Sequence, residues 1–130
     1  MLGEIVNDKY LIAVSGTHGK TTTTAMISKI LIDNNFDPIV FVGGNVSFLN
    51  NASSRIGNGK VAVVEADEYD RSFLTLKPDI AVVTNIELDH TDIYKDIDDI
   101  MNAFKKFLEN GKQGMNIVAF EFPEILHYRF

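Results

Sequence analysis

Residues 10–21 read YLIAVSGTHGKT, an apolar run that leads directly into a glycine-rich turn. The run Tyr10–Ser15 has the length and composition of a buried β-strand. The residues from Thr22 to Asn34 predict a helix. A glycine-rich turn between a strand and a helix is the setting of a phosphate-binding loop, because glycine lets backbone N–H groups approach phosphate oxygens and the helix N-terminus offers further donors.

The polar side chains of this turn suit a nucleotide phosphate site. Lys20 would neutralise charge on the β- and γ-phosphates, and the hydroxyl of Thr21 would coordinate Mg²⁺. Thr22 could add a further hydroxyl, whereas Thr23 and Thr24 are expected to be ordinary residues of the first helical turn. The spacer between the first glycine and the Gly-Lys-Thr triplet is shorter than in the common motif. The competing interpretation is a structural turn that carries a surface lysine.

The rest of the chain alternates strand-like with helix-like stretches. The strand-like runs are continuously apolar, which indicates burial on both faces, as in a parallel sheet covered by helices. The sequence therefore predicts an α/β fold with an open, doubly wound, mostly parallel sheet. Further strands are expected at Ile39–Val42, Val61–Glu65 and Ile80–Thr84, a loop at Asn50–Asn58, and a helix from Ile97 to about Asn110. One apolar face of the first helix is expected to comprise Met26, Ile27, Ile30 and Leu31.

The last part of the chain, residues 111–130, differs in composition from the rest. Ile117–Phe120 could form a further strand, and the residues from Glu121 onward are rich in aromatic side chains. Such a segment is expected to pack on something, either this domain or a neighbouring one. We therefore expect residues 1–110 to form the nucleotide-binding domain and residues 111–130 a tail of separate character.

Acidic and histidine side chains follow the predicted strands. Glu65 ends one apolar strand and is a candidate Mg²⁺ ligand. His90 follows the next strand, a short way beyond Thr84-Asn85. Ligands of open α/β sheets bind outside the carboxyl ends of the strands, so these groups should face the phosphate loop. Imidazole is an unusual ligand for Mg²⁺, and an ordinary loop histidine remains the alternative. Other carboxylates that could reach the site are Glu68 and Asp70, and Asp89 could orient His90.

Composition excludes several classes of function. The chain has 130 residues, 45% of them hydrophobic, no cysteine and a formal charge of −6. An acidic domain is a poor candidate for binding nucleic acid, which requires a basic surface. No apolar run approaches the roughly 18 residues of a membrane-spanning helix, and the N-terminus lacks the features of a signal peptide. A cytoplasmic protein is therefore expected.

Three segments together resemble the Mur ligase family. Gly16–Met26 is similar to the shortened ATP loop of these enzymes, and Glu65–Glu68 and Thr84–His90 resemble two further family motifs in the right order. The histidine after Gly-Thr and the Glu-Ala-Asp-Glu segment resemble the branch that adds L-alanine to UDP-N-acetylmuramate. A related recycling branch, which attaches a whole tripeptide, has a similar loop. The resemblance covers about residues 1–110.

The resemblance implies an ATP-dependent amide ligase of peptidoglycan synthesis. ATP would phosphorylate the muramoyl carboxylate, and the amine of alanine would attack the resulting acyl phosphate. Lys20, Glu65 and His90 are the implied catalytic residues, with Thr21, Glu65 and His90 near Mg²⁺. Asn45 sits where several members carry a functional asparagine, although an ordinary turn residue is the alternative. The implied ATP-phosphate ligands are Gly16, Thr17, His18, Gly19, Lys20, Thr21 and Thr22.

The chain also departs from the family pattern. Complete members have an N-terminal domain that binds the UDP end of the substrate and a C-terminal domain that binds the amino acid. Only Met1–Lys9 precede the first strand here. These departures suggest a fragment whose partners would be the two other domains. The alternative is a nucleotide-binding module without ligase activity. Lys105 lies near a position where some relatives carry a modified lysine, but the alanine-adding branch generally does not use one.

Overall fold

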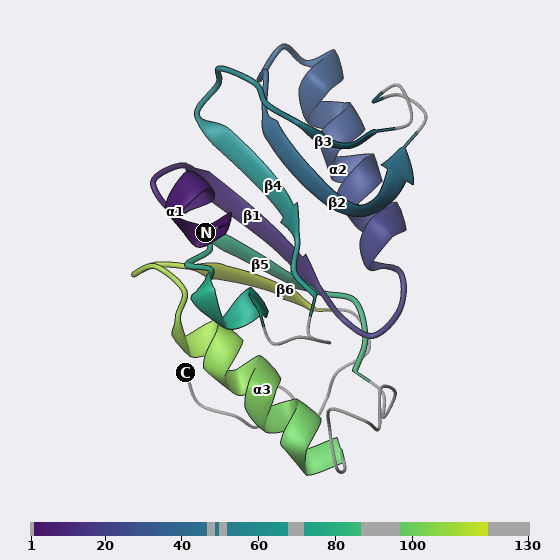
Figure 1. The fold of residues 1–130 in the computed structure, drawn as a ribbon. Helices are drawn as coiled ribbons and strands as arrows, with labels where there is room; N and C mark the ends of the chain where they lie inside the picture. The colour runs from purple at the N-terminus through teal and green to yellow at the C-terminus, as the bar shows by residue number, and fades with distance from the viewer. Residues whose placement is uncertain (1, 47–48, 50–51, 68–71, 87–96, 120–130) are drawn as a thin grey trace.

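A mostly parallel sheet organises the chain. The computed structural model describes residues 2–46, 49, 52–67, 72–86 and 97–119. Within these residues six strands form one sheet in the order β3-β2-β4-β1-β5-β6 (Figure 1). The strands are β1 (Tyr10–Ser15), β2 (Ile39–Val46), β3 (Ala52–Arg55), β4 (Val61–Glu65), β5 (Ile80–Val83) and β6 (Asn116–Ala119). The α-helices are α1 (Leu2–Val6), α2 (Lys20–Asp33) and α3 (Ile97–Glu109), and Ser72–Thr75 form a 3₁₀ helix.

The central strand β1 determines where the loops of the sheet meet. It pairs in parallel with β4 on one side and with β5 on the other, with Ala13 opposite both Val64 and Ala81. The pairs β2–β4 and β5–β6 are also parallel, and only the pair β2–β3 is antiparallel among the described strands. The carboxyl ends of β1, β4 and β5 therefore lie side by side at one edge. This confirms the predicted fold class.

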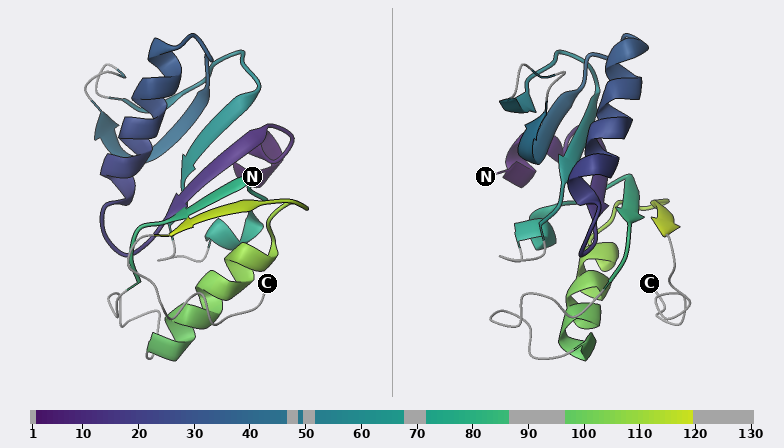
Figure 2. Two further views of the ribbon diagram at one scale, coloured as in Figure 1. Left: turned by 180° about the vertical axis from the view of Figure 1, so that it is seen from behind. Right: turned by 90° about the vertical axis from the view of Figure 1, so that its right-hand side faces the viewer.

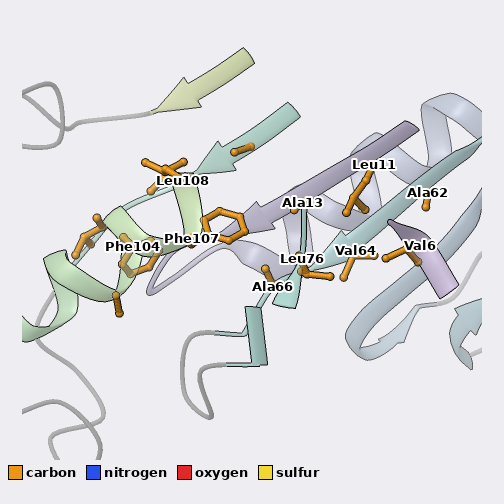
Figure 3. Close-up of a cluster of buried hydrophobic side chains, with 14 of the residues drawn as sticks. Val6, Leu11, Ala13, Ala62, Val64, Ala66, Leu76, Phe104, Phe107 and Leu108 are labelled. Atoms are coloured by element: carbon orange, nitrogen blue, oxygen red, sulfur yellow. The ribbon is translucent and has the colours of Figure 1, made fainter. Parts of the chain in front are cut away.

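Helices cover both faces of the sheet, as a doubly wound fold requires. The helix α2 lies on one face, and α1 lies on the opposite one (Figure 2). On the α1 side, alternate residues of the central strands join Phe104 and Phe107 of α3 in a buried core (Figure 3). On the α2 side a smaller cluster forms around Val40 and Leu49. Burial on both faces explains why the strands read as continuous apolar runs.

The helix α2 packs on the sheet differently from the prediction. Its buried residues are Thr24 and Ser28. Met26 and Ile30, which belong to the predicted apolar face, are 62% and 61% exposed. They line an apolar groove of about 500 Å³, which continues over β1 to Val118 of β6. The small hydroxyl side chains allow the helix to lie close to the sheet, and the large apolar ones are left at its flank.

Other boundaries also differ from the prediction. The strand β2 continues through Gly43-Gly44, where an end was expected. The expected loop at 50–58 contains β3, whose sequence Ala-Ser-Ser-Arg carries no apolar pattern because it forms an exposed edge. The short helix α1 was not predicted. The expected strand near Ile117 is present as β6, whereas the packing of the aromatic segment beyond it lies outside the described residues. None of the described helices is long and apolar enough to cross a membrane.

The amino-terminal edge of the sheet is held by ionic side chains. Asp79, just before β5, accepts hydrogen bonds from the Leu11 N–H and from Lys112 Nζ, both at 2.8 Å. Lys112 Nζ also donates to the Lys9 carbonyl at 2.6 Å. Farther along this edge Asp37 pairs with Arg55 at 2.9 Å and accepts from the Asn58 N–H at 2.9 Å. These bonds tie the starts of the parallel strands, and the end of the antiparallel strand β3, to neighbouring segments at this edge.

Candidate functional site

The candidate site lies at the carboxyl edge of the sheet, where three strand ends meet. The loop from Gly16 to Gly19 leaves β1 and leads into α2, and Glu65 is the last residue of β4. Thr84 follows directly after β5, and its N–H donates to the Ser15 carbonyl at 3.0 Å. Parallel pairing thus brings the phosphate loop, the strand-end carboxylate and the Thr84 segment together. His90 lies outside the described residues, so its place at this edge stays a prediction.

The two glycines of the loop are needed for different reasons. Gly16 has φ 134°, and a Cβ built on it would lie 1.9 Å from Thr84 Oγ1. Gly19 has φ 84° and is the N-cap of α2, but a Cβ there would meet nothing within 4 Å. Gly16 is therefore required by close packing as well as by backbone conformation. Gly19 is favoured by backbone conformation alone.

Lys20 begins α2 and faces acidic side chains. Its side chain is 12% exposed, and Nζ lies 3.9 Å from Asp67 Oδ1, whose side chain is 53% exposed. Asp67 was not among the predicted site residues. A signal was available, because Asp67 follows Glu65 by two residues just beyond a strand end. The lysine is thus held at the loop with its ammonium group beside a carboxylate.

Glu65 lies beside the hydroxyl group of the loop. Thr21 Oγ1 is 3.0 Å from both Glu65 Oε1 and Glu65 Oε2. The Gly43 N–H also donates to Glu65 Oε2. A Cβ on Gly43 would lie 2.9 Å from both carboxylate oxygens, so the glycine lets the strand pass beside Glu65. This contact was not predicted, because a Gly-Gly pair at that point indicates only the end of a strand.

The donor set at this point suits a hard cation. A hydroxyl and a carboxylate supply oxygen ligands, which Mg²⁺ prefers, and Mg²⁺ in nucleotide sites takes its remaining ligands from phosphates and water. In the part of the chain that the structure describes, no group of three or more His, Cys, Asp or Glu side chains could hold a metal ion by itself. The residues present therefore fit Mg²⁺ as a companion of a bound nucleotide, with Thr21 and Glu65 as its protein ligands.

Thr84 and Asn85 contact the loop directly. They begin the segment after β5 that was predicted to border the phosphate site, although neither was assigned a role of its own. Asn85 Oδ1 accepts from the His18 N–H at 2.8 Å, and Asn85 Nδ2 donates to the His18 carbonyl at 3.0 Å. The Thr17 N–H donates to the Asn85 carbonyl at 2.9 Å. Thr84 Oγ1 donates to the His18 carbonyl at 2.6 Å. Their position at a strand end next to the loop strand was the available signal.

The remaining candidates are placed as follows. Thr22 lies in the exposed first turn of α2, and Thr17 is buried in the loop. The backbone of Asn45 lies in β2. Lys105 lies on α3, where its Nζ is 3.9 Å from Glu109. The proposed roles of Glu68, Asp70, Asp89 and His90 concern residues outside the described part of the chain.

Comparison with known proteins identifies relatives of this chain. Residues 14–127 match the Mur ligase middle domain. A UDP-N-acetylmuramate–L-alanine ligase of Geotalea uraniireducens is 51% identical over 108 residues, which cover 83% of this chain and 23% of that protein. The chain thus spans about a quarter of the length of this relative.

Two solved structures are also similar. The UDP-N-acetylmuramate–alanine ligase of Thermotoga maritima has a TM-score of 0.78 and 35% identity over 92% of this chain and 27% of its own. The UDP-N-acetylmuramate:L-alanyl-gamma-D-glutamyl-meso-diaminopimelate ligase of a Neisseria species has a TM-score of 0.83 and 29% identity, covering 96% of this chain and 44% of its own. Together with the match over residues 14–127, these likenesses show that the chain belongs to the Mur ligase family, whose middle domain it matches.

Proposed function

We propose that this chain is the ATP-binding part of an ATP-dependent ligase that joins L-alanine to UDP-N-acetylmuramate in the cytoplasm. The observation that carries the proposal is the distance of 3.0 Å between Thr21 Oγ1 and the carboxylate oxygens of Glu65, next to Lys20 at the start of a helix. The named activity comes from the relatives, which are 45–53% identical to this chain. The substrates UDP-N-acetylmuramate and L-alanine belong to the complete enzyme.

Each of the site residues that the structure describes has a defined task in this proposal. The start of α2 offers backbone N–H groups and a positive partial charge to the phosphates. Lys20 contributes a full positive charge to the β- and γ-phosphates. Thr21 and Glu65 would hold Mg²⁺, which would neutralise phosphate charge and align the phosphates for transfer. His90 remains a proposed ligand near a second Mg²⁺.

The chemistry proposed for the complete enzyme proceeds in two steps. The carboxylate of the muramoyl group attacks the γ-phosphorus of ATP, which gives an acyl phosphate and ADP. The amine of alanine then attacks the acyl carbon and releases phosphate. Both steps depend on holding three reactants together, so much of the rate comes from positioning. The part played by this chain is to fix the phosphates of ATP.

A ligase that attaches a tripeptide is the second candidate. The observation in its favour is the TM-score of 0.83 to the Neisseria enzyme, above the 0.78 of the Thermotoga alanine ligase. The sequence identities point the other way, at 29% and 35%. We favour the alanine-adding function because the curated alanine ligases are more similar in sequence still.

Calorimetric titration with Mg²⁺ and a non-hydrolysable ATP analogue tests the nucleotide site. Lys20→Ala removes a charge-assisted contact and should weaken binding by about 1.5–3 kcal/mol. Glu65→Gln keeps the shape of the side chain and removes its charge, so it should weaken binding more with Mg²⁺ than without it. Lys29→Ala, on the exposed side of the same helix, is the matched control. Equal affinity for the Lys20 variant and the wild type would contradict the proposal.

A second experiment tests the ligase reaction. The chain with Mg²⁺, ATP, UDP-N-acetylmuramate and L-alanine should give negligible product by mass spectrometry, because the positioning of two of the three reactants is proposed to lie in other domains. Addition of the remaining domains of a relative as a separate polypeptide, or fusion to them, should restore product. Robust turnover by the chain alone would show that those domains are dispensable.

A further inference from the structure

The residues after β5 contact the backbone of the phosphate loop. Thr84 and Asn85 make hydrogen bonds to the backbone of Ser15, Thr17 and His18. None of these bonds uses the side chain of a proposed nucleotide ligand. The contacts therefore act on the shape of the loop.

The side-chain amide of Asn85 matches both polar groups of one peptide residue. Its Oδ1 accepts from the His18 N–H at 2.8 Å, and its Nδ2 donates to the His18 carbonyl at 3.0 Å. The opposite amide orientation would place donor against donor at the His18 N–H and acceptor against acceptor at the His18 carbonyl. The polar groups of His18 therefore fix the orientation of the Asn85 amide. A carboxylate could make only the first of the two bonds. Alanine could make neither.

Thr84 adds a second donor to the same carbonyl and also fills the space under the loop. Its hydroxyl is 2.6 Å from the His18 carbonyl and 3.3 Å from the Ser15 carbonyl. A hydroxyl has one hydrogen, so the shorter contact is the one that it donates. The Cβ position of Gly16 would be 1.9 Å from this oxygen. The backbone of the loop thus lies directly against the Thr84 hydroxyl.

These bonds determine which donors face a phosphate. The N–H groups of Thr17 and His18 donate to Asn85. The first hydrogen bond within α2 runs from the Thr23 N–H to the Gly19 carbonyl at 3.0 Å, so helix geometry gives the N–H groups of Thr21 and Thr22 no partner inside the helix. Phosphate binding by backbone donors should therefore concentrate at the start of α2.

We propose that Thr84 and Asn85 are positioning residues that hold the loop 16–19 in the conformation that binds nucleotide phosphate. The inference rests on the proposed function and deepens it. Neither side chain needs to touch ATP. They act by fixing the His18 peptide, and a loop displaced by even a fraction of an ångström would misalign Lys20 and the donors of α2.

The test compares variants that keep or lose the hydroxyl group of Thr84. Thr84→Val keeps the shape and removes the hydroxyl, whereas Thr84→Ser keeps the hydroxyl. Titration with Mg²⁺ and a non-hydrolysable ATP analogue should show affinity about tenfold lower for Thr84→Val and for Asn85→Ala, and within about threefold of wild type for Thr84→Ser. Without nucleotide, the NMR amide signals of Thr17 and His18 should shift in Thr84→Val and stay in place in Thr84→Ser.

The outcomes separate this inference from the proposed function. Failure of the wild type to bind the analogue would overturn the proposed function, and this inference with it. Binding by the wild type with equal affinity in Thr84→Val and Asn85→Ala would overturn the inference alone. Equal losses in Thr84→Ser and Thr84→Val would also overturn it, because the hydroxyl would then have no part in the effect. If Asn85→Ala fails to fold, the Thr84 pair decides by itself.

Discussion

The two edges of the sheet use the same kinds of side chain for different purposes. At the amino edge Asp79 lies between the Leu11 N–H and Lys112, with both contacts at 2.8 Å. At the carboxyl edge Lys20 and Asp67 are 3.9 Å apart. Carboxylates and lysines occur at both edges, but among the described residues the Lys112–Asp79 pair at the amino edge is much shorter than the Lys20–Asp67 pair at the carboxyl edge.

This difference shows why residue type alone does not identify a site. Asp79 and Lys112 satisfy each other and nearby backbone groups, which stabilises the sheet. Glu65 and Lys20 lie beside a loop with two glycines of positive φ and a helix N-terminus. A phosphate and its Mg²⁺ could bind there. The position relative to the strand ends is what separates the structural carboxylate Asp79 from Glu65, the carboxylate proposed to bind Mg²⁺.

Substitution of the loop glycines should have the largest effect. Gly16→Ala places a Cβ against Thr84 and keeps an unfavourable φ, so we expect a loss of about 3 kcal/mol in the free energy of unfolding and loss of nucleotide binding. Gly19→Ala is the matched control, because it meets no neighbouring atom and should cost only about 1–2 kcal/mol. Urea unfolding of both variants measures the difference. Equal losses would mean that the contact with Thr84 is unimportant.

Removal of the amino-edge carboxylate should affect stability without affecting the site. Asp79→Ala leaves the buried Leu11 N–H without its acceptor and Lys112 without its counter-ion, so we expect a loss of about 2 kcal/mol in the free energy of unfolding. The affinity for nucleotide should stay within about twofold of wild type below the unfolding transition. Asp33→Ala, in the exposed pair with Lys29, should change stability by about 0.5 kcal/mol or less. A loss of nucleotide affinity in Asp79→Ala would contradict the assignment of stability to the amino edge and of nucleotide binding to the carboxyl edge.

Within the described part of the chain, the helix α2 contains a buried hydroxyl without a hydrogen-bond partner, and its removal should have a smaller, stabilising effect. Thr24 is fully buried, and its hydroxyl has no hydrogen-bond partner among the described residues. Thr24→Val removes the unsatisfied oxygen and keeps the shape, so the free energy of unfolding should rise by about 1 kcal/mol. Ser28→Ala is the control, because the Ser28 hydroxyl donates to the Thr24 carbonyl at 2.7 Å. A gain in Ser28→Ala as large as that in Thr24→Val would point to helix propensity instead.

The smallest expected effect concerns pH at the amino edge. The Asn58 N–H, followed by Arg55, holds the pKa of the Asp37 carboxyl below its ordinary value. A lowered pKa in the folded state means that this carboxylate stabilises the fold above the unfolded pKa of about 4 and loses its contribution as pH falls through the folded value. Urea unfolding of wild type and Asp37→Asn from pH 6 to pH 3 should therefore give stabilities that converge below about pH 4. A constant difference across that range would contradict the assignment.

The parts of the fold that could be predicted are those with a strong local signal. The strands around Ile12, Val63 and Val82 are continuous apolar runs, which are typical of strands buried on both faces. The helix with Phe104 repeats apolar residues at helical spacing. The loop was predictable because glycine, lysine and threonine must occur in order between a strand and a helix. The nearness of Glu65 to Thr21 followed from the rule that the carboxyl ends of parallel strands share one edge.

The parts that could not be predicted depend on tertiary contacts. The strand β3 has an ordinary polar sequence and becomes a strand only because the edge of β2 is available for pairing. The burial of Thr24 in place of Met26 depends on how closely the helix approaches the sheet. The contact of Asn85 with His18 joins residues 67 positions apart, and no local pattern specifies which polar group at a strand end meets the loop.

The strand order has a consequence for the time course of folding. The strand β1 comes early in the chain, but Tyr10 pairs with Val61 and Ile12 with Ile80. The central strand therefore cannot complete its pairing until β5 has been synthesised, and such non-local pairing makes folding slow. The loop after β1 gains its contacts from Thr84, 66 positions beyond His18. During synthesis on the ribosome, the glycine-rich loop would emerge before β2, β4 and β5 and take its final shape among the last parts of the sheet.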